Sequence, residues 1–253
     1  MDFSVSPVGI AFVAFGRPHL VALGLVALAN LGLLPLARLA GSVPRRAVQL
    51  GLAGAILTAF TAHMTWRIYA GLWDVRDDLP LQLCDVMAIV TVWALVARHR
   101  PLYDYVYFLG IAGSAQALLA SPVGIYGYPH LYFICSMLSH GAMVTAGIQC
   151  AVLEGHRPTL RSLWRVAVWA IAYTAVIFAL NLWLGSNYLF IGHKPEFPSL
   201  IDSLGPWPLY VPVIIGLALI LFHLLYLPFA WSDWRRPGNR TQSPLQDSVR
   251  PPF

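Results

Sequence analysis

Two side chains in this sequence have the chemistry of a nucleophile and a general base, Cys84 and His140. A thiol becomes a strong nucleophile once a base takes its proton. A neutral imidazole can accept that proton and later return it to a leaving group. The pair therefore predicts covalent acyl transfer, provided that the fold brings the two residues together.

Each of the two residues also has a structural interpretation. Cys84 is either an inert buried thiol or the partner of Cys135 in a disulfide. His140 is either a base or a structural histidine that is hydrogen-bonded to Ser136, one helical turn away. With 3 cysteines in the chain, neither a disulfide framework nor a cysteine-rich metal site is expected.

The residue after Cys84 is a carboxylate, Asp85. On a helix it points about 100° away from the thiol. It either orients a histidine as the third member of a catalytic triad or forms an ion pair with Arg67 or Arg76.

Other polar side chains are candidates for substrate binding. The amides of Gln82, Gln116 and Asn181 can donate hydrogen bonds to a developing oxyanion or to a lipid headgroup, or they can join helices to one another. Lys194 and its neighbour His193 can hold a phosphate as point charges. Alternatively, the loop that carries them only sets the start of the last apolar stretch.

A metal site is the remaining alternative for the histidines. His63 adds a third imidazole to those of His140 and His193, and Asp85 adds a carboxylate. No HxxxH, HExxH or CxxC spacing is present, and these spacings are what helical metal sites use to supply paired ligands. We therefore expect neither a metal nor a cofactor.

These residues lie in apolar stretches, which must position them. The chain has 253 residues, 58% hydrophobic and 11% charged, whereas about a quarter of the residues of a soluble domain are charged. Each stretch approaches the ~20 residues that cross a bilayer as a helix. We predict an all-α, polytopic membrane bundle of seven transmembrane helices: His19–Leu36, Ala47–Tyr69, Leu81–Ala97, Leu102–Leu119, Leu131–Leu153, Leu163–Leu184 and Tyr210–Ala230.

Basic residues predict the orientation of the bundle. Of the 16 Lys and Arg, four lie on one side: Arg17, Arg67, Arg76 and Lys194. The others lie on the opposite side: Arg38, Arg45, Arg46, Arg98, Arg100, Arg157, Arg161, Arg165, Arg235, Arg236, Arg240 and Arg250. The positive-inside rule then places the N-terminus outside and the C-terminus in the cytoplasm. It also accounts for the net charge of +5, so no nucleic-acid partner is expected.

Depth along each helix follows from its direction. His63, the segment 82–85, Gln116, the segment 135–140 and Asn181 all fall in the outer half of their spans. Titratable groups in a bilayer normally face the bundle interior or a water-filled cavity. We expect these side chains to line one pocket that opens toward the outer leaflet, with small residues allowing close helix approach around it: Gly110, Gly113, Ser114 and Gly141.

The predicted domain organisation is simple. Residues 1–231 form a single transmembrane domain. Residues 232–253, rich in Pro, Arg, Ser and Gln, are expected to be a disordered cytoplasmic tail.

Several motifs in order resemble the YwaF-like family of bacterial integral membrane proteins, from about residue 15 to 230. They are Phe-Gly-Arg-Pro-His-Leu (15–20), Leu-Pro-Leu-Gln-Leu-Cys-Asp (79–85), Ser-His-Gly (139–141), Asn-Tyr…Lys-Pro (187–195) and Leu-Gly-Pro-Trp-Pro-Leu-Tyr (204–210). Gln82 departs from the pattern, because many members of that family carry a histidine at this position.

The resemblance implies an activity. The family is related to a eukaryotic transmembrane acyltransferase that moves polyunsaturated acyl chains between phospholipids and ether lysophospholipids. It is more distantly related to androgen-induced transmembrane hydrolases of fatty-acid esters, which use a threonine and a histidine. A cysteine nucleophile in one helix and a histidine in another are implied here, and by position these are Cys84 and His140.

Residue chemistry and resemblance together predict an intramembrane lipid acyltransferase or lipid-ester hydrolase. Its substrates would be phospholipids or lysophospholipids of a bacterial cytoplasmic membrane, in which the protein is multi-pass. The alternative is a non-catalytic transporter or lipid- and solute-binding protein that uses the same cavity.

Overall fold

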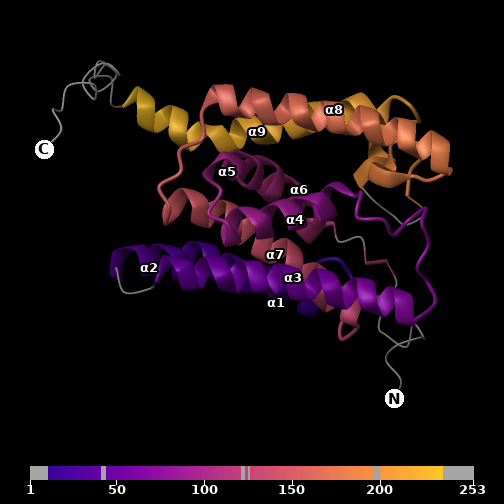
Figure 1. Ribbon diagram of the computed structural model, residues 1–253, viewed down its shortest axis with the longest axis horizontal. Coiled ribbons are helices and arrows are strands. Elements are labelled where there is room, and N and C mark those ends of the chain that lie inside the picture. Colours follow the sequence, from indigo (N-terminus) through magenta and orange to yellow (C-terminus); the bar gives the residue numbers. More distant parts are fainter. Residues whose placement is uncertain (1–10, 41–43, 121–122, 125, 196–199, 236–253) are drawn as a thin grey trace, which may run out of the picture.

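The computed structural model describes residues 11–40, 44–120, 123–124, 126–195 and 200–235. Within these ranges every regular element is helical (Figure 1). Helices are expected here because a lipid environment cannot satisfy backbone polar groups, so they must pair within the segment. The elements are α1 (Arg17–Ala27), the π-helix η1 (Leu28–Leu33), α2 (Leu34–Ala40), α3 (Arg45–Tyr69), α4 (Leu83–Val96), η2 (Arg100–Leu102), α5 (Tyr103–Tyr105), the π-helix η3 (Val106–Gly110), α6 (Ile111–Leu119), α7 (Leu131–Val152), α8 (Leu160–Leu184), the short helices η4 (Tyr188–Phe190) and η5 (Leu200–Leu204), and α9 (Tyr210–Trp234).

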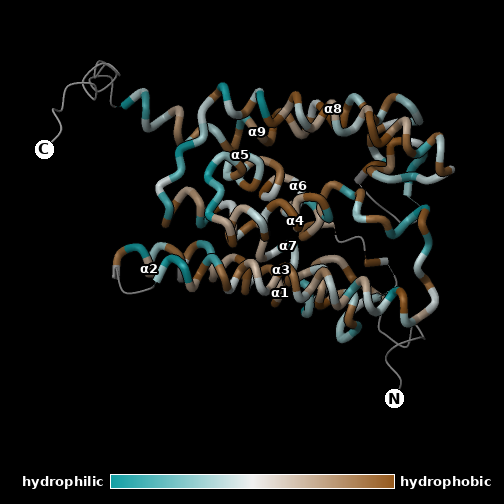
Figure 2. Tube along the Cα trace, viewed as in Figure 1, coloured by the Kyte–Doolittle hydropathy of each residue, from teal (hydrophilic) through white to brown (hydrophobic). Residues whose placement is uncertain are grey.

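Five helical stretches in the described part of the chain are long and apolar enough to cross a membrane: Arg17–Leu39, Arg45–Tyr69, Leu131–Val152, Leu160–Leu184 and Tyr210–Trp234. They correspond to five of the seven spans expected from the sequence. Large apolar side chains face outward on them, with Leu31 82% and Trp183 78% exposed, and brown, hydrophobic residues run along these helices in Figure 2. Lipid is the solvent that suits such surfaces, so this is a multi-pass membrane protein.

The other two expected spans take a different form. α4 has 14 residues, which at ~1.5 Å per residue covers about 21 Å of the ~30 Å of hydrocarbon. It starts two residues later than expected because the chain before it is irregular. The stretch 100–119 begins with the short helix η2, after which α5, the π-helix η3 and α6 follow one another without a break, so the backbone is helical over residues 103–119.

The helices form three layers in Figure 1. α1, α2 and α3 lie on one side, α4 to α7 lie in the middle, and α8 and α9 lie on the other side. α7 is the central helix. In its most apolar stretch of 18 residues 72% of the residues are buried, compared with 6% in the corresponding stretch of α9. The middle layer therefore holds the residues that are shielded from lipid.

Two glycines on α7 permit its close packing. A Cβ at Gly147 would lie 2.5 Å from Ile111 Cγ1, and a Cβ at Gly141 would lie 2.7 Å from Val26 Cγ2. The expected role of Gly141 in close helix approach is confirmed. The same expectation of close helix approach is wrong for Gly113, where a Cβ would meet nothing within 4 Å.

The last helix is longer than expected. α9 continues to Trp234 and so includes the first three residues of the predicted tail. From residue 236 on, that tail lies outside the described residues.

Candidate active site

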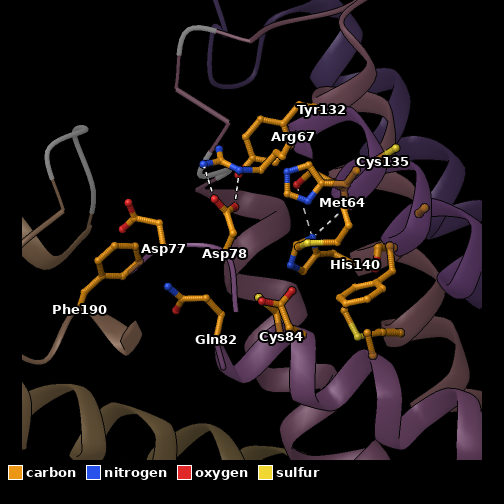
Figure 3. Close-up of a pocket in the computed structure, with 18 residues that line it drawn as sticks. Met64, Arg67, Asp77, Asp78, Gln82, Cys84, Tyr132, Cys135, His140 and Phe190 are labelled. Atoms are coloured by element: carbon orange, nitrogen blue, oxygen red, sulfur yellow. Dashed lines mark hydrogen bonds and ion pairs between the residues drawn. The ribbon is translucent and has the colours of Figure 1, made fainter. Parts of the chain in front are cut away.

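Cys84 and His140 line the same cavity, which has a volume of about 230 Å³ and lies between α3, α4, α7 and η4. We call it the polar cavity. In Figure 3 the imidazole of His140 lies on the side of the cavity that faces Cys84. Its walls also hold most of the other polar residues singled out in the sequence: His63, Gln82, Asp85, Cys135, Ser136 and Ser139.

Cys84 is the second residue of α4, whose N-cap is Gln82. The first N–H groups of a helix have no partner within the helix, and the helix dipole places partial positive charge there. Both features stabilise negative charge that develops on an oxyanion next to Cys84. Cys84 is partly exposed as a residue, and all 3 cysteines are free, so the alternative disulfide between Cys84 and Cys135 does not form.

His140 is held in a single tautomer. Its Nδ1 lies 2.8 Å from the backbone carbonyl oxygen of Ser136. A carbonyl oxygen only accepts hydrogen bonds, so Nδ1 carries the proton and Nε2 of the neutral ring holds the lone pair. Nε2 is buried and has no hydrogen-bond partner among the described residues. The contact with Ser136 that belongs to the structural interpretation of His140 is thus present, but it uses only Nδ1 and leaves Nε2 able to accept a proton.

His63 supplies a second imidazole to the polar cavity. Its ring stacks on Tyr132 with the ring centroids 4.5 Å apart and the planes inclined by 4°. Within the described ranges its Nε2 is also buried without a partner. His63 therefore has the geometry to hydrogen-bond a polar group of a ligand.

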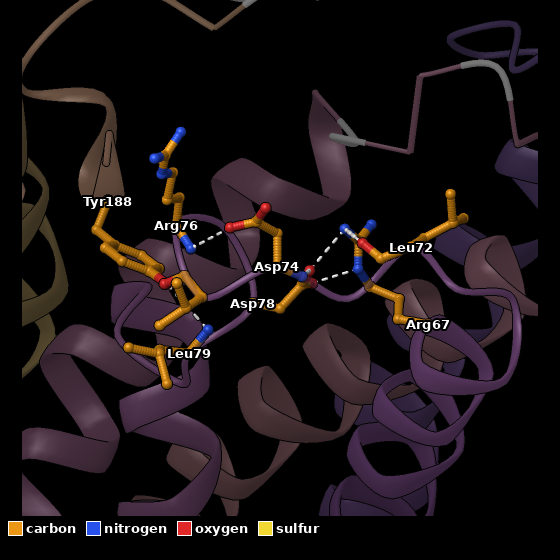
Figure 4. A network of polar contacts seen from close by, with 8 residues as sticks. Arg67, Leu72, Asp74, Arg76, Asp78, Leu79 and Tyr188 are labelled. Carbon is orange, nitrogen blue, oxygen red and sulfur yellow. Dashed lines mark hydrogen bonds and ion pairs between the residues drawn. The ribbon is translucent and has the colours of Figure 1, made fainter. Parts of the chain in front are cut away.

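The carboxylates of the cavity are arranged differently from the expectation. Asp78, which is 6% exposed, forms the ion pair with Arg67 (Figure 4). Arg67 Nη2 donates to Asp78 Oδ2 at 2.7 Å and to the carbonyl of Leu72 at 2.8 Å. The expected pairing of Asp85 with Arg67 or Arg76 is wrong. Asp78, on the α3–α4 loop, forms the ion pair with Arg67 instead. Asp85 remains a wall residue of the polar cavity beside Cys84.

Gln82 connects the start of α4 to η4. Its Oε1 accepts the backbone N–H of Leu189 at 3.0 Å. No described residue accepts a hydrogen bond from its Nε2, which carries two N–H donors. Because Gln82 also lines the cavity, this amide is available to donate to a ligand there.

A second cavity, of about 290 Å³, shares four wall residues with the polar cavity: Gln82, Cys84, His140 and Phe190. We call it the apolar cavity, because most of its other wall residues are hydrophobic. It lies between α4, α6 and η4. The Cys–His pair thus lies where two cavities of different polarity meet.

Asn181 is not part of the site. Its Nδ2 donates to the carbonyl of Tyr188 at 2.8 Å, and its Oδ1 accepts from the N–H of Tyr188 and the hydroxyl of Ser186. The amide therefore joins the end of α8 to η4, which is the second of the two roles expected for it, and Asn181 is a wall residue of neither cavity.

Gln116 and Lys194 are only marginal to the site. Gln116 is an exposed wall residue of the apolar cavity, and its Nε2 donates to the carbonyl of Ala112 in its own helix at 3.3 Å. Lys194 donates to the backbone carbonyl of Asp202 at 3.1 Å and is a wall residue of neither cavity. The structure gives Lys194 a loop contact rather than a place beside Cys84.

Among the residues of the polar cavity that were missed in the sequence are Asp77, Asp78, Tyr132 and Phe190. A signal existed for Tyr132, since it lies four and eight residues before Ser136 and His140, on one face of a helix. Phe190 has a positive φ of 53°, which no sequence pattern predicts for an aromatic residue. As for metals, no group of three or more His, Cys, Asp or Glu side chains in the described part could hold an ion.

Comparison with known proteins gives one match. The model of the TMEM164 family matches residues 14–226, which is most of the chain and includes every wall residue of both cavities. The chain belongs to the TMEM164 family. Searches of curated proteins and of solved structures found no match. The matched range is nearly the one over which the sequence motifs were recognised, so family membership applies to the whole bundle.

Proposed function

We propose that this TMEM164-family protein is an intramembrane lipid acyltransferase or lipid-ester hydrolase, with Cys84 as nucleophile and His140 as general base. One observation carries the proposal. The bond from His140 Nδ1 to the Ser136 carbonyl leaves Nε2 as a buried lone pair without a partner, in the cavity that Cys84 also lines. A buried ring nitrogen without a partner is unusual for a purely structural histidine, because buried polar atoms are normally hydrogen-bonded.

The first half-reaction follows from these positions. Sγ of Cys84 attacks the carbonyl carbon of a lipid ester while its proton passes to Nε2 of His140. Because a free thiolate is costly in a cavity enclosed by protein, the proton moves as the attack proceeds. When the tetrahedral intermediate collapses, the C–O bond breaks and the leaving alkoxide takes the proton from His140. The products are a thioester on Cys84 and a lysolipid.

The second half-reaction restores the cysteine. The hydroxyl of a lysolipid, or water, gives its proton to Nε2 of His140 and attacks the thioester carbonyl. The C–S bond breaks, and His140 returns the proton to the sulfur. A lysolipid acceptor yields a new phospholipid, and water yields a free fatty acid.

Two donors would stabilise the oxyanion in both half-reactions. One is the unused Nε2 of Gln82, and the other is the backbone N–H of Cys84 at the start of α4. Donors fixed in a site without bulk water stabilise developing charge effectively because they need no reorientation. These two donors take the role that was expected for Asn181, whose amide is bonded to Tyr188.

We further propose that the chain crosses the membrane seven times, with α4 and the stretch 100–119 as the two crossings enclosed by protein. The distribution of Lys and Arg supports an outside N-terminus and a cytoplasmic C-terminus. The polar cavity would then open toward the outer leaflet of a bacterial cytoplasmic membrane, where phospholipids reach it.

A transporter or non-catalytic lipid-binding protein is the rival function. The cavities would serve it equally, since a lipid or solute can bind between these helices without a covalent step. Uptake or binding that persists in Cys84→Ala and His140→Ala variants would support it.

The test of the enzyme uses a phospholipid with an alkyne-tagged acyl chain. We expect the purified protein in nanodiscs to acquire a hydroxylamine-sensitive acyl label, and Cys84→Ala to lose it. Cys135→Ala is the matched control, because Cys135 is a free thiol in the wall of the same cavity. Equal labelling of Cys84→Ala and the wild type would overturn the covalent mechanism.

A further inference from the structure

The apolar cavity extends from Cys84 to α6, whereas the polar cavity extends from Cys84 to α3. Its walls between the Cys–His pair and α6 are mostly hydrocarbon: Leu83, Met87, Leu109, Ala117, Leu189 and Ile201. The polar cavity, in contrast, holds three carboxylates, one guanidinium and a second imidazole: Asp77, Asp78, Asp85, Arg67 and His63.

A third cavity, of about 210 Å³, adjoins the apolar cavity. It lies between α8, α9 and the inner helices, and it shares Leu83, Leu109 and Leu189 with the apolar cavity. Thr174 brings a hydroxyl to its walls, and this hydroxyl already donates to the carbonyl of Ala170 at 2.9 Å. We call it the α8–α9 cavity.

On the basis of the proposed function, we propose that the apolar cavity and the α8–α9 cavity together hold the acyl chain that is esterified to Cys84, while the polar cavity holds the glycerol and headgroup side of the lipid. An ester carbonyl at Cys84 has an alkyl chain on one side and an oxygen-rich group on the other. The apolar cavity matches the alkyl chain, and the polar cavity matches the oxygen-rich group. Hydrocarbon leaves water and polar surroundings for apolar walls.

The volumes indicate that a long chain needs both apolar spaces. Ligand cavities commonly measure about 300–1,000 Å³. The apolar cavity alone, at about 290 Å³, is just below this range. A short acyl group fits within it, whereas a long chain must pass Leu83 and Leu189 into the α8–α9 cavity.

A groove between α3 and α4 is the rival path. It touches the polar cavity at Phe60 and Ala88 but includes neither Cys84 nor His140. Exposed side chains such as Leu57 and Trp93 form its walls. Bilayer lipid on the outside of the protein accounts for this groove.

Gly113 controls the size of the apolar cavity. It lies on α6 in the cavity wall, and a Cβ there would meet nothing within 4 Å. A larger side chain at this position therefore enters the cavity without displacing a neighbouring helix. Gly54 on α3 is a matched control, because its Cβ would also meet nothing within 4 Å and it is not a wall residue of these cavities. Both Gly→Leu changes gain the same helix propensity.

The experiment compares butyryl and palmitoyl p-nitrophenyl esters as acyl donors. The full-length protein is held in nanodiscs of ether-linked phosphatidylcholine, whose chains contain no ester, and the acyl label on the Cys84 peptide is measured by mass spectrometry. We expect Gly113→Leu to keep butyryl labelling and to lose palmitoyl labelling by about tenfold or more. Gly54→Leu should label with both donors as the wild type does.

A second readout does not require catalysis. Palmitic acid should protect Cys84 from alkylation by N-ethylmaleimide in the wild type and Gly54→Leu, but not in Gly113→Leu. Absence of any acyl label in the wild type, with this protection pattern intact, would refute the enzyme and support the chain-binding cavity. The cavity assignment is overturned if Gly113→Leu treats both chain lengths alike. It is also overturned if Val92→Trp, which fills the α3–α4 groove, changes the chain-length preference instead.

Discussion

Leu189 donates its backbone N–H to Oε1 of Gln82 at 3.0 Å, across 107 positions of the sequence. The bond fixes the short helix η4 against the N-terminus of the helix that carries Cys84. Leu189 and Phe190 have positive φ angles of 61° and 53°, a conformation that is unfavourable for residues with a side chain. Further bonds hold it, including Tyr210 Oη to the carbonyl of Phe190 at 2.6 Å. The wall between the two cavities is therefore rigid.

This bond yields a selective test of the oxyanion donor. Gln82→Glu keeps an acceptor oxygen for Leu189 but removes the N–H₂ donor, so the wall stays in place while stabilisation of the oxyanion is lost. We expect acylation of Cys84 to slow by about a hundredfold, measured as label formation over time. Alkylation of Cys84 by iodoacetamide is the control, since this displacement forms no oxyanion, and its rate in Gln82→Glu should be unchanged. Equal slowing of acylation and alkylation would mean that Gln82 is not an oxyanion donor.

The convergence of Cys84, His140, His63 and Gln82 on one cavity could be predicted from the sequence. Each residue of a helix advances by ~1.5 Å, so the position along a span gives the depth of a side chain. All four were placed in the same half of the membrane, and all four line the polar cavity.

Rotation about the helix axis and the path of the loops could not be predicted in the same way. Asn181 lies at the predicted position along α8 but uses its amide on the η4 segment, which depends on backbone angles that no sequence pattern encodes. Asp78 takes the guanidinium of Arg67 because the α3–α4 loop folds back over the end of α3. Competition between two nearby carboxylates for one cation is decided by that loop geometry.

The carbonyl of Ser136, rather than its hydroxyl, orients His140. The Nδ1 to carbonyl distance is 2.8 Å, whereas the hydroxyl lies at 3.4 Å. Ser136→Ala should therefore leave acylation of Cys84 nearly unchanged, while His140→Gln should slow it by about 10²–10⁴-fold through loss of the base. Single-turnover labelling measures both rates. A large loss in Ser136→Ala would show that the hydroxyl takes part in proton transfer.

The ion pair between Arg67 and Asp78 should contribute strongly to stability. The Asp78 side chain is 5% exposed and that of Arg67 is 22% exposed, and removal of one partner leaves the other as a buried, uncompensated charge. We expect Asp78→Asn to lower the free energy of unfolding by about 3 kcal/mol. Asp233→Asn breaks the exposed pair of Arg157 and Asp233, with side chains 53% and 52% exposed, and should change it by less than about 1 kcal/mol. Thermal unfolding in detergent measures the stability of both variants. Similar losses of stability in Asp78→Asn and Asp233→Asn would contradict a strong contribution from the Arg67–Asp78 pair.

His130 at the start of α7 should make stability depend on pH. Its Nδ1 accepts the backbone N–H of Tyr132 at 3.1 Å, which requires an unprotonated Nδ1, and burial lowers the pKa of the imidazole. Between this lowered pKa and the ordinary value of about 6.5, the unfolded chain binds a proton that the folded chain does not. The contribution of His130 is therefore complete above about pH 6.5 and falls as the pH is lowered below it. His130→Asn keeps a capping side chain without this titration. As the pH is lowered, the unfolding temperature of the wild type should therefore fall more than that of this variant. A difference that stays constant with pH would contradict the role of His130.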